Sequence, residues 1–286
     1  MRYTVLGATG FIGTRVAALA RSLGHDVCCP GRDENLDGRD LGHVIYSIGI
    51  TADFRSRPHD TVTAHVTKLQ EVLTRTSFDS LVYLSSTRVY ARCSNPIAVA
   101  GEWSGISEES TIPVRPTDFS DLYNLSKLLG ESIALASSPR ARVARLSNVI
   151  GPDFDSNNFV ISVIRDCVQN GRLELQTTID SAKDYVAVED VAAVLLKIGP
   201  TGSHSIYNIA SGVNTSHGEI VRELVRLTGA TVSVTENAPT VRFPQIDVRR
   251  AATEFNYSPR RLDGLLPELV SGIRDHHSRQ QSKDVL

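Results

Sequence analysis

Three glycines near the amino terminus constrain the fold more than any other feature of the sequence. Gly7, Gly10 and Gly13 follow the pattern G-x-x-G-x-x-G and lie between an apolar run at 3–6 and an apolar pattern of helical spacing at 11–23. Glycines in such a strand-to-helix turn let a pyrophosphate reach the backbone N–H groups at the start of the helix. A tight turn without a ligand is the alternative, and the position between a strand and a helix disfavours it.

Further apolar runs alternate with helical patterns along the chain. The runs typical of buried strands stand at 3–6, 26–29, 44–48, 81–84, 143–146 and 205–209. Helical patterns at 61–74 and 121–136 separate several of them. Strands that alternate with helices favour a parallel sheet with crossovers on both faces. We therefore predict an α/β fold of the Rossmann type, a doubly wound parallel sheet with a smaller C-terminal α/β substrate lobe.

The character of the sequence changes after Gly151 and Pro152. Amphipathic helical patterns follow at 159–170 and 217–228, and an edge-strand pattern at 231–235. We predict a dinucleotide-binding domain of 1–150 plus 184–212, a substrate-binding lobe of 151–183 plus 213–276, and a frayed polar tail of 277–286.

Two segments of the predicted dinucleotide-binding domain are unusual. Only 11 residues separate Arg32 from Val44, where a complete doubly wound half needs a helix and a strand. We expect this domain to be shortened there. The segment 91–120, with Trp103 and scattered prolines, indicates a flap over the site.

A tyrosine and a lysine share one face of the helical pattern at 121–136. Tyr123 and Lys127 are four residues apart, and the chain has only five lysines against 25 arginines, so the pair is a rare event. A tyrosine that acts as a base near pH 7 needs a preference for phenolate of about three pKa units, or roughly 4 kcal/mol. A neighbouring ammonium group favours the phenolate. An ordinary surface pair is the alternative.

Hydroxyl groups follow the predicted strand at 81–84. Ser86 stands in the run S-S-T-R-V-Y, at the carboxyl end of a buried strand, which is the edge of an open α/β sheet where ligands bind. A hydroxyl group there can donate a hydrogen bond to a reacting oxygen. Taken alone, the position is more typical of a capping serine.

In this order the motifs resemble the extended short-chain dehydrogenase/reductase family, and within it the nucleotide-sugar epimerase/dehydratase branch. The segments 145–152 and 184–192 extend the resemblance over about residues 1–265. The resemblance implies a nicotinamide cofactor, a nucleotide-diphosphate sugar as substrate, and a homodimer formed through the helices at 61–74 and 121–136. His65 stands where relatives often have asparagine, and we interpret it as a structural residue rather than a base.

The resemblance also implies a role for individual residues. Tyr123 would be the catalytic acid and base, Lys127 would hold the nicotinamide ribose, and Ser86 would polarise the substrate oxygen. The implied cofactor contacts are Gly7, Thr9, Gly10, Phe11, Ile12, Gly13, Arg32, Asp40, Leu41, Ser47, Ile48, Gly49, Tyr123 and Lys127. The implied substrate contacts are Thr87, Arg88, Asn148, Lys183 and Arg242. For Arg242 an ordinary surface position is the alternative.

One departure from the family pattern concerns the cofactor. Relatives that use NAD carry an aspartate at the end of the second strand, where this chain has Gly31 followed by Arg32. An arginine can pair with a 2′-phosphate, and the missing carboxylate removes a repulsion, so we expect NADP in preference to NAD. Alternatively, Asp33 turns inward and the cofactor is NAD.

A second departure concerns the reaction. Dehydratases and decarboxylases of this branch place acidic residues directly after the catalytic serine or threonine, where this chain has Thr87 and Arg88. Hydride transfer at a sugar carbon remains, as an epimerase or as a 4-keto reductase. Dehydration or decarboxylation is one alternative. A non-catalytic NADP-binding sensor or scaffold is another, although such relatives typically lack the tyrosine or the lysine.

The overall composition argues against several classes of partner. The 30 basic and 32 acidic residues leave a formal net charge of −2, which gives no support to nucleic-acid binding. Without a signal-peptide layout or a long apolar stretch, we expect a cytoplasmic protein that does not span a membrane. The four cysteines form no disulfide framework, and with the eight histidines they form no metal-ligand spacing, so we expect no metal.

Overall fold

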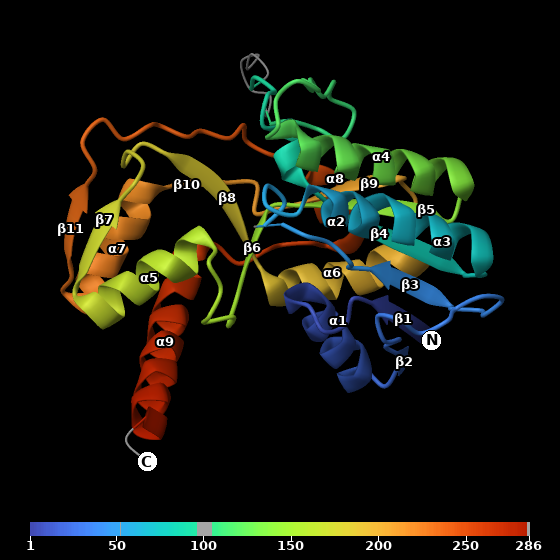
Figure 1. The fold of residues 1–286 in the computed structure, drawn as a ribbon, viewed down its shortest axis with the longest axis horizontal. Helices are drawn as coiled ribbons and strands as arrows, with labels where there is room; N and C mark the ends of the chain where they lie inside the picture. Colours follow the sequence, from blue (N-terminus) through green and yellow to red (C-terminus); the bar gives the residue numbers. More distant parts are fainter. Residues whose placement is uncertain (52, 96–104, 285–286) are drawn as a thin grey trace.

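The computed structural model describes residues 1–51, 53–95 and 105–284, with the side chains up to residue 282. Trp103 and part of the predicted flap lie outside the described residues. The chain forms a large lobe around a central sheet and a smaller lobe beside it, from which one helix projects (Figure 1).

Six parallel strands form the central sheet of the large lobe, in the order β2-β1-β3-β4-β5-β9. The strands are β1 (Arg2–Leu6), β2 (Asp26–Cys28), β3 (His43–Tyr46), β4 (Ser80–Ser86), β5 (Ala141–Leu146) and β9 (Ile206–Ile209). The chain runs from β1 to β2 on one side and then crosses to β3 on the other side of β1. The order therefore reverses at β1, and the glycine turn follows at this switch point.

The helices of the large lobe cover both faces of this sheet (Figure 1). They are α1 (Phe11–Ser22) and α6 (Val188–Thr201) on one face, and α2 (Pro58–Val62), a π-helical turn η1 (Thr63–Thr67), α3 (Lys68–Arg75) and α4 (Asp121–Ser137) on the other. Alternation along β4 serves both faces: Val82 belongs to the core beneath α1 and α6, and Tyr83 to the core beneath α3 and α4. The doubly wound fold predicted from the sequence is confirmed.

Two short elements complete the large lobe. They are a 3-10 turn η2 (Thr87–Tyr90), directly after β4, and α8 (Arg249–Phe255), which packs beside β9. At the other edge of the sheet, β2 is the last strand among the described residues. The short segment between Arg32 and Val44 contains no helix and, before β3, no further strand.

The smaller lobe is built from short strands and three helices. They are β6 (Asn148–Ile150), β8 (Ala182–Ala187) and β10 (Asn214–Ser216) in one sheet, β7 (Arg172–Leu175) and β11 (Thr231–Val234) in another, and α5 (Phe159–Asn170), α7 (His217–Thr228) and α9 (Leu262–Asp284). These helices and strands share one apolar core. No helix in the described part of the chain is long and apolar enough to cross a membrane.

Three expectations differ from this structure in detail. Only β9 of the segment 184–212 returns to the central sheet, because β8 pairs with β6 and β10 instead. The helix expected at 61–74 begins at Pro58 and contains the π-helical turn η1. The tail expected to fray from 277 continues as helix α9 to Asp284.

Candidate active site

The glycine turn is closed too tightly for a side chain at Gly7 or Gly13. Gly7 has a φ of +85°, and a Cβ on Gly13 would lie 2.3 Å from the Gly7 carbonyl oxygen and 2.8 Å from the Ser47 Oγ. Gly10 is the N-cap of α1 and offers no side-chain cap, so the first N–H groups of this helix are left for another acceptor. Thr9, Phe11 and Ile12 belong to the same turn. This arrangement fits a bound pyrophosphate.

The structure brings some of the other expected cofactor residues to this turn. Ser47, Ile48 and Gly49 follow β3, and the Ser47 Oγ donates a hydrogen bond to the Leu6 carbonyl oxygen at 2.7 Å. Arg32 lies exposed in the loop after β2.

Asp40 and Leu41 are placed differently, because they precede β3. They therefore lie at the amino edge of the sheet, where Asp40 pairs with Arg2 at 2.8 Å and Leu41 is buried. The structure does not bring these two residues to the glycine turn.

The three expected catalytic residues meet at the carboxyl edge of the sheet. Ser86 ends β4, while Tyr123 and Lys127 lie on successive turns of α4 and are each 4% exposed. Burial raises the pKa of Tyr123, and a hydrogen bond with Ser86 and the positive charge of Arg88 oppose that rise. The structure therefore places a phenol between a hydroxyl group and a guanidinium group.

Lys127 is a buried cation with an incomplete set of partners. Its Nζ donates to the Leu84 carbonyl oxygen at 2.8 Å and lies 5.0 Å from the centre of the Tyr83 ring. Burial lowers the pKa of Lys127 to about 7, although the charge of Glu131 acts in the opposite direction. An ammonium group has three donors, so Lys127 retains capacity for a ligand oxygen.

His65, in the π-helical turn, is held by hydrogen bonds on both ring nitrogens. Its Nε2 accepts from the Ile50 N–H at 3.2 Å, so the proton resides on Nδ1, which donates to the Ser126 Oγ at 2.8 Å. The ring meets Tyr123 edge-on, with 5.4 Å between centroids. Burial, with the charge of Lys127, lowers the pKa of His65 to about 2. The imidazole is therefore neutral and structural.

The backbone at Gly49 passes close to Lys127, which bears on whether a dinucleotide cofactor fits here. A Cβ on Gly49 would lie 3.3 Å from the His65 Nε2 and 3.4 Å from the Lys127 Nζ. A side chain at this position would fill the space beside the lysine. Together with the uncapped start of α1, this open space fits a dinucleotide that extends from the glycine turn to Lys127.

The expected substrate residues are spread over both lobes. Thr87 is buried and Arg88 lies beside Tyr123, whereas the Asn148 amide donates to the Asp184 carbonyl oxygen at 2.7 Å. On β8, Lys183 lies 5.8 Å from the centre of the Phe243 ring. Arg242 is exposed next to β8 and bridges to Ala182 through its backbone.

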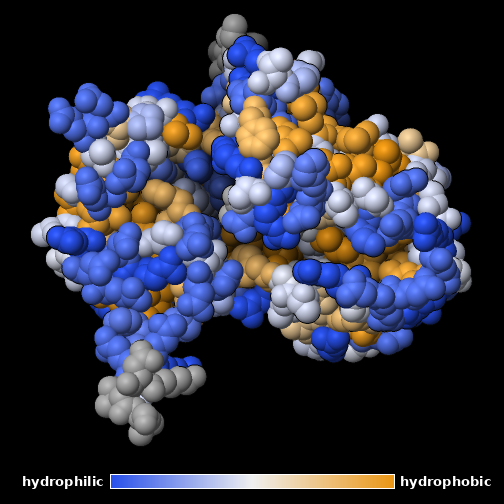
Figure 2. Space-filling model, viewed as in Figure 1, coloured by the Kyte–Doolittle hydropathy of each residue, from blue (hydrophilic) through white to orange (hydrophobic). Residues whose placement is uncertain are grey.

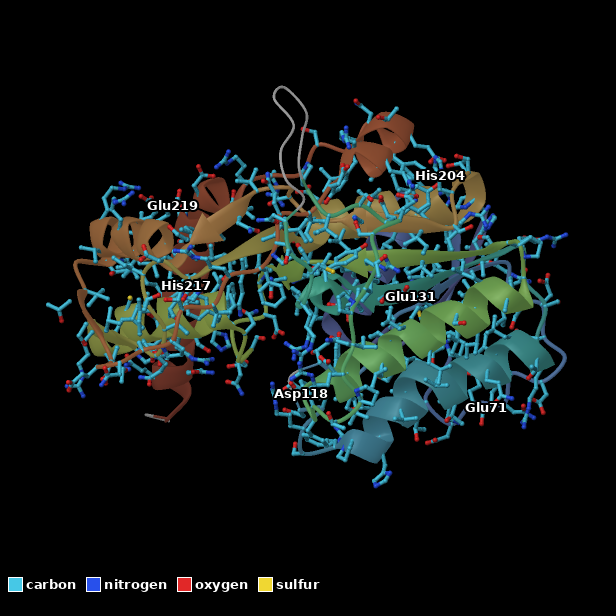
Figure 3. All side chains as sticks on the ribbon, turned by 90° about the horizontal axis from the view of Figure 1, so that it is seen from above. Glu71, Asp118, Glu131, His204, His217 and Glu219 are labelled. Carbon is cyan, nitrogen blue, oxygen red and sulfur yellow. The ribbon has the colours of Figure 1, made fainter. Side chains whose placement is uncertain are left out.

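Sequence reasoning missed two groups of residues near the site. Phe54 packs against Tyr123 with 5.4 Å between ring centroids, and no local pattern marks it. Glu131 faces the sheet from α4 (Figure 3) and pairs with Arg145 at 2.6 Å, both side chains being 5% exposed. The spacing from Tyr123 through Lys127 to Glu131 repeats every four residues, and that repeat was the available signal.

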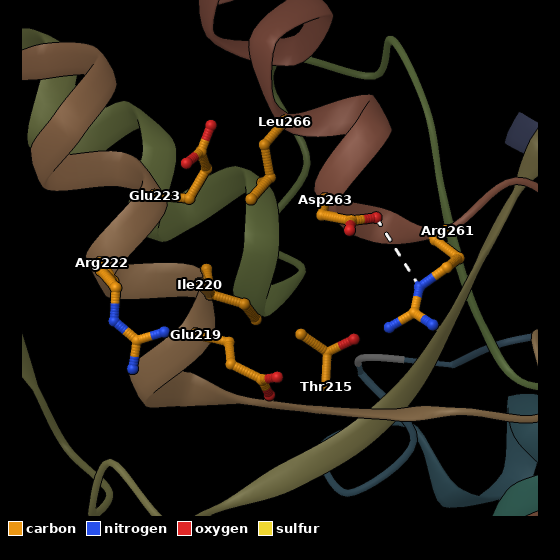
Figure 4. Close-up of a pocket in the computed structure, with 8 residues that line it drawn as sticks. All are labelled: Thr215, Glu219, Ile220, Arg222, Glu223, Arg261, Asp263 and Leu266. Carbon is orange, nitrogen blue, oxygen red and sulfur yellow. Dashed lines mark ion pairs between the residues drawn. The ribbon is translucent and has the colours of Figure 1, made fainter.

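A polar groove elsewhere in the molecule contains none of the expected site residues. It lies between the start of α7 and the start of α9 (Figure 4), where Arg261 and Asp263 pair at 3.8 Å. Among the described residues, no three histidine, cysteine, aspartate or glutamate side chains gather in a way that could hold a metal ion.

Comparison with known proteins identifies the family. The model of the NAD dependent epimerase/dehydratase family matches residues 40–210. The chain therefore belongs to this family, which confirms both the resemblance inferred from the motifs and the expectation of an enzyme. The UDP-glucose 4-epimerase of Mycolicibacterium smegmatis is 26% identical over 310 residues, which cover 96% of this chain and 96% of that protein.

Solved structures share the fold over almost the whole chain. MoeE5 in complex with UDP-glucose and NAD superposes with a TM-score of 0.78 at 20% identity, covering 96% of this chain and 99% of that one. RMD from Pseudomonas aeruginosa, complexed with NADPH, gives 0.76 at 22% identity over the same shares.

Proposed function

We propose that the protein is a nucleotide-sugar oxidoreductase that acts by reversible hydride transfer at a sugar carbon. The observation that carries the proposal is the meeting of Ser86, Tyr123 and Lys127 at the carboxyl edge of the sheet, next to the glycine turn. Gly7, Gly10 and Gly13 would hold the pyrophosphate of the cofactor, and Lys127 its nicotinamide ribose. The chemistry that a bound nicotinamide supplies is reversible hydride transfer.

Residues of this chain would transfer the proton of the reacting hydroxyl group. Tyr123 removes the proton of the reacting hydroxyl group during oxidation and returns it during reduction. Ser86 supports both directions, because a hydroxyl group beside the phenol can hydrogen-bond the same substrate oxygen. A hydrogen bond with Ser86 and the positive charge of Arg88 favour the phenolate that burial disfavours.

The residues after Ser86 argue for hydride transfer without elimination. Thr87 and Arg88 offer no carboxylate at the positions where the dehydratases and decarboxylases of this family place one. The epimerase relative favours epimerisation, whereas an exchangeable NADPH would favour reduction of a 4-keto sugar. A non-catalytic role is disfavoured, because Tyr123 and Lys127 are both present and lie together.

For the cofactor we propose NADP in preference to NAD. Arg32 is exposed in the loop after β2, and Gly31 stands where relatives that use NAD carry an aspartate, so Arg32 can pair with a 2′-phosphate. The Glu34 carboxylate, which accepts from the Gly31 N–H at 3.0 Å, is itself paired with Arg39. A fluorescence titration of the protein with NADPH and with NADH measures the preference. Tighter binding of NADH, unchanged by Arg32→Ala, would exclude this assignment.

Three further features belong to the proposal. Lys183 and Arg242 would hold the diphosphate of the nucleotide sugar. Apolar surface gathers over α4 (Figure 2), where Leu129 is 51% exposed. This surface and α3 of the same subunit would together form the homodimer interface. We place the enzyme in the cytoplasm, consistent with four free cysteines.

A product assay tests the proposed reaction. The protein is incubated with candidate 4-hydroxy nucleotide sugars and catalytic NADP+, and with candidate 4-keto nucleotide sugars and stoichiometric NADPH. An epimerised product without net conversion of the cofactor identifies an epimerase, because that reaction returns the hydride. A reduced product with one NADPH consumed per turnover identifies a reductase. Release of water or carbon dioxide would exclude both.

A further inference from the structure

Arg88 occupies an unusual place for an arginine, because it lies against the catalytic tyrosine. Its guanidinium carbon is 5.8 Å from the centre of the Tyr123 ring and 5.4 Å from that of Phe54. The Nη2 donates to the Ser120 carbonyl oxygen at 3.4 Å, and the buried Nε has no hydrogen-bond partner. A buried donor without a partner is costly unless a ligand completes it.

Two more cations lie near Arg88, and none of the three forms an ion pair among the described residues. The Arg55 guanidinium carbon lies 4.5 Å from the centre of the same Phe54 ring. Lys183 lies on β8, where burial and then the charge of Arg88 lower its pKa. Like charges placed together repel, so an anion is the complementary ligand for this cluster.

The carboxylates closest to the cluster are already engaged elsewhere. Asp121 accepts from the Arg92 Nε at 2.7 Å and from the Arg115 N–H at 2.8 Å. Asp118 pairs with the other end of the same Arg92 guanidinium. Neither carboxylate forms an ion pair with Arg88. The positive charge at Tyr123 is therefore not neutralised by the protein itself.

We propose that Arg88, assisted by Arg55, binds a carboxylate carried by the sugar of the substrate, so that the substrate class is a nucleotide-linked uronic acid. This inference rests on the proposed function, because Tyr123 defines where the reacting hydroxyl group lies. A guanidinium group 5.8 Å from the centre of the Tyr123 ring can reach substituents of the same sugar. Its planar fork of donors matches a carboxylate.

The other anion of a nucleotide sugar is its diphosphate, and Lys183 and Arg242 are the residues we assign to it. Arg88 could bind the diphosphate only if the sugar were bound on the far side of Arg88 from Tyr123. The two arrangements differ in which ligands lose affinity when Arg88 is changed. A carboxylate contact affects uronic acids alone, whereas a diphosphate contact affects every nucleotide sugar.

Binding measurements on the cofactor-loaded protein test the inference. Isothermal titration compares UDP-glucuronic acid with UDP-glucose, and GDP-mannuronic acid with GDP-mannose, since the members of each pair differ only at C6, by a carboxylate in place of a hydroxymethyl group. We expect the protein to bind one uronic acid about tenfold or more tightly than its neutral partner. Arg88→Gln should abolish this difference, with a much smaller loss of affinity for the neutral sugar than for the uronic acid. Arg57→Gln, an exposed arginine paired with Asp60, should keep the difference and serves as the matched control.

Each other outcome has a definite meaning. Equal affinities within a pair that binds, or an equal loss for both members in Arg88→Gln, would overturn the inference and leave the proposed function intact. Absence of binding by all four nucleotide sugars would count against the proposed function itself. If Arg88→Gln does not fold, the wild-type preference and its reduction in Arg88→Lys, which keeps the charge but not the fork, decide the question.

Discussion

Two buried cations near α4 differ in how completely they are paired. Arg145 on β5 binds Glu131 through both Nε and Nη2 and donates to the Tyr90 hydroxyl at 2.6 Å. Lys127, one turn before Glu131 on α4, has a single carbonyl oxygen as its described hydrogen-bond acceptor. Burial opposes the charge of both groups. Glu131 and Tyr90 nevertheless raise the pKa of Arg145, whereas the pKa of Lys127 falls to about 7.

On α4, this difference distinguishes a residue that stabilises the fold, Glu131, from a residue that we assign to the reaction, Lys127. A buried charge with a full set of partners is fixed in its protonation state and supports the fold only as long as every partner remains. A buried charge with few partners can titrate and bind a ligand near neutral pH. Changes on the Tyr123 and Lys127 side should therefore alter activity, and changes on the Glu131 and Arg145 side should alter stability.

The largest effect is expected for Tyr123→Phe. Removal of the phenolic proton donor should lower kcat by about 10²–10⁴-fold, the range typical of a general acid or base. The fold and the affinity for the cofactor should remain, because the change removes a single hydrogen bond, with the Ser86 side chain. Turnover measured beside a cofactor titration checks both statements. Unchanged turnover would refute the assignment of Tyr123.

The next largest effect is expected for Glu131→Gln, which leaves Arg145 as an uncompensated buried charge. We expect a loss of about 3–5 kcal/mol in the free energy of unfolding, measured by urea denaturation. The double variant Glu131→Gln, Arg145→Met should recover part of this loss, because it removes the stranded charge.

A pair at the surface, with Arg226 65% and Glu223 25% exposed, gives the matched control for the buried one. Glu223→Gln breaks the surface pair with Arg226 on α7 and should leave stability unchanged. A similar loss of stability in Glu223→Gln and Glu131→Gln would contradict the contrast between the buried and the exposed pairs.

The sequence predicted the catalytic side of this comparison and missed the structural side. Glycine spacing and the Tyr123–Lys127 pair are local patterns, so they were visible along the chain and fixed the expected fold class and the expected triad. The four-residue repeat puts Glu131 on the same face of the helix as Tyr123, but its contact with Arg145 forms only when β5 and α4 pack, and no local pattern encodes that contact. The same reason explains Asp40, whose place depends on how the shortened segment enters β3.

The smallest effect is expected for His65→Asn and appears only in acid. The pKa of His65 is about 2 in the folded protein and near 6.5 when unfolded, so the unfolded chain binds the extra proton between these values. Stability from this group is therefore complete above pH 6.5 and is lost as the pH falls. The loss amounts to about 2 kcal/mol between pH 8 and pH 5. Asparagine does not titrate, so the variant should lose less stability over this range.

Urea midpoints at pH 8, 6.5 and 5 for both proteins measure this difference. His217, whose pKa burial and then Lys183 lower to about 4, contributes in the same direction to both proteins and cancels. A His65→Asn curve parallel to the wild-type curve would mean that the imidazole accepts a proton in the folded state. The hydrogen bonds to Ile50 and Ser126 would then not fix it as the neutral partner of Tyr123.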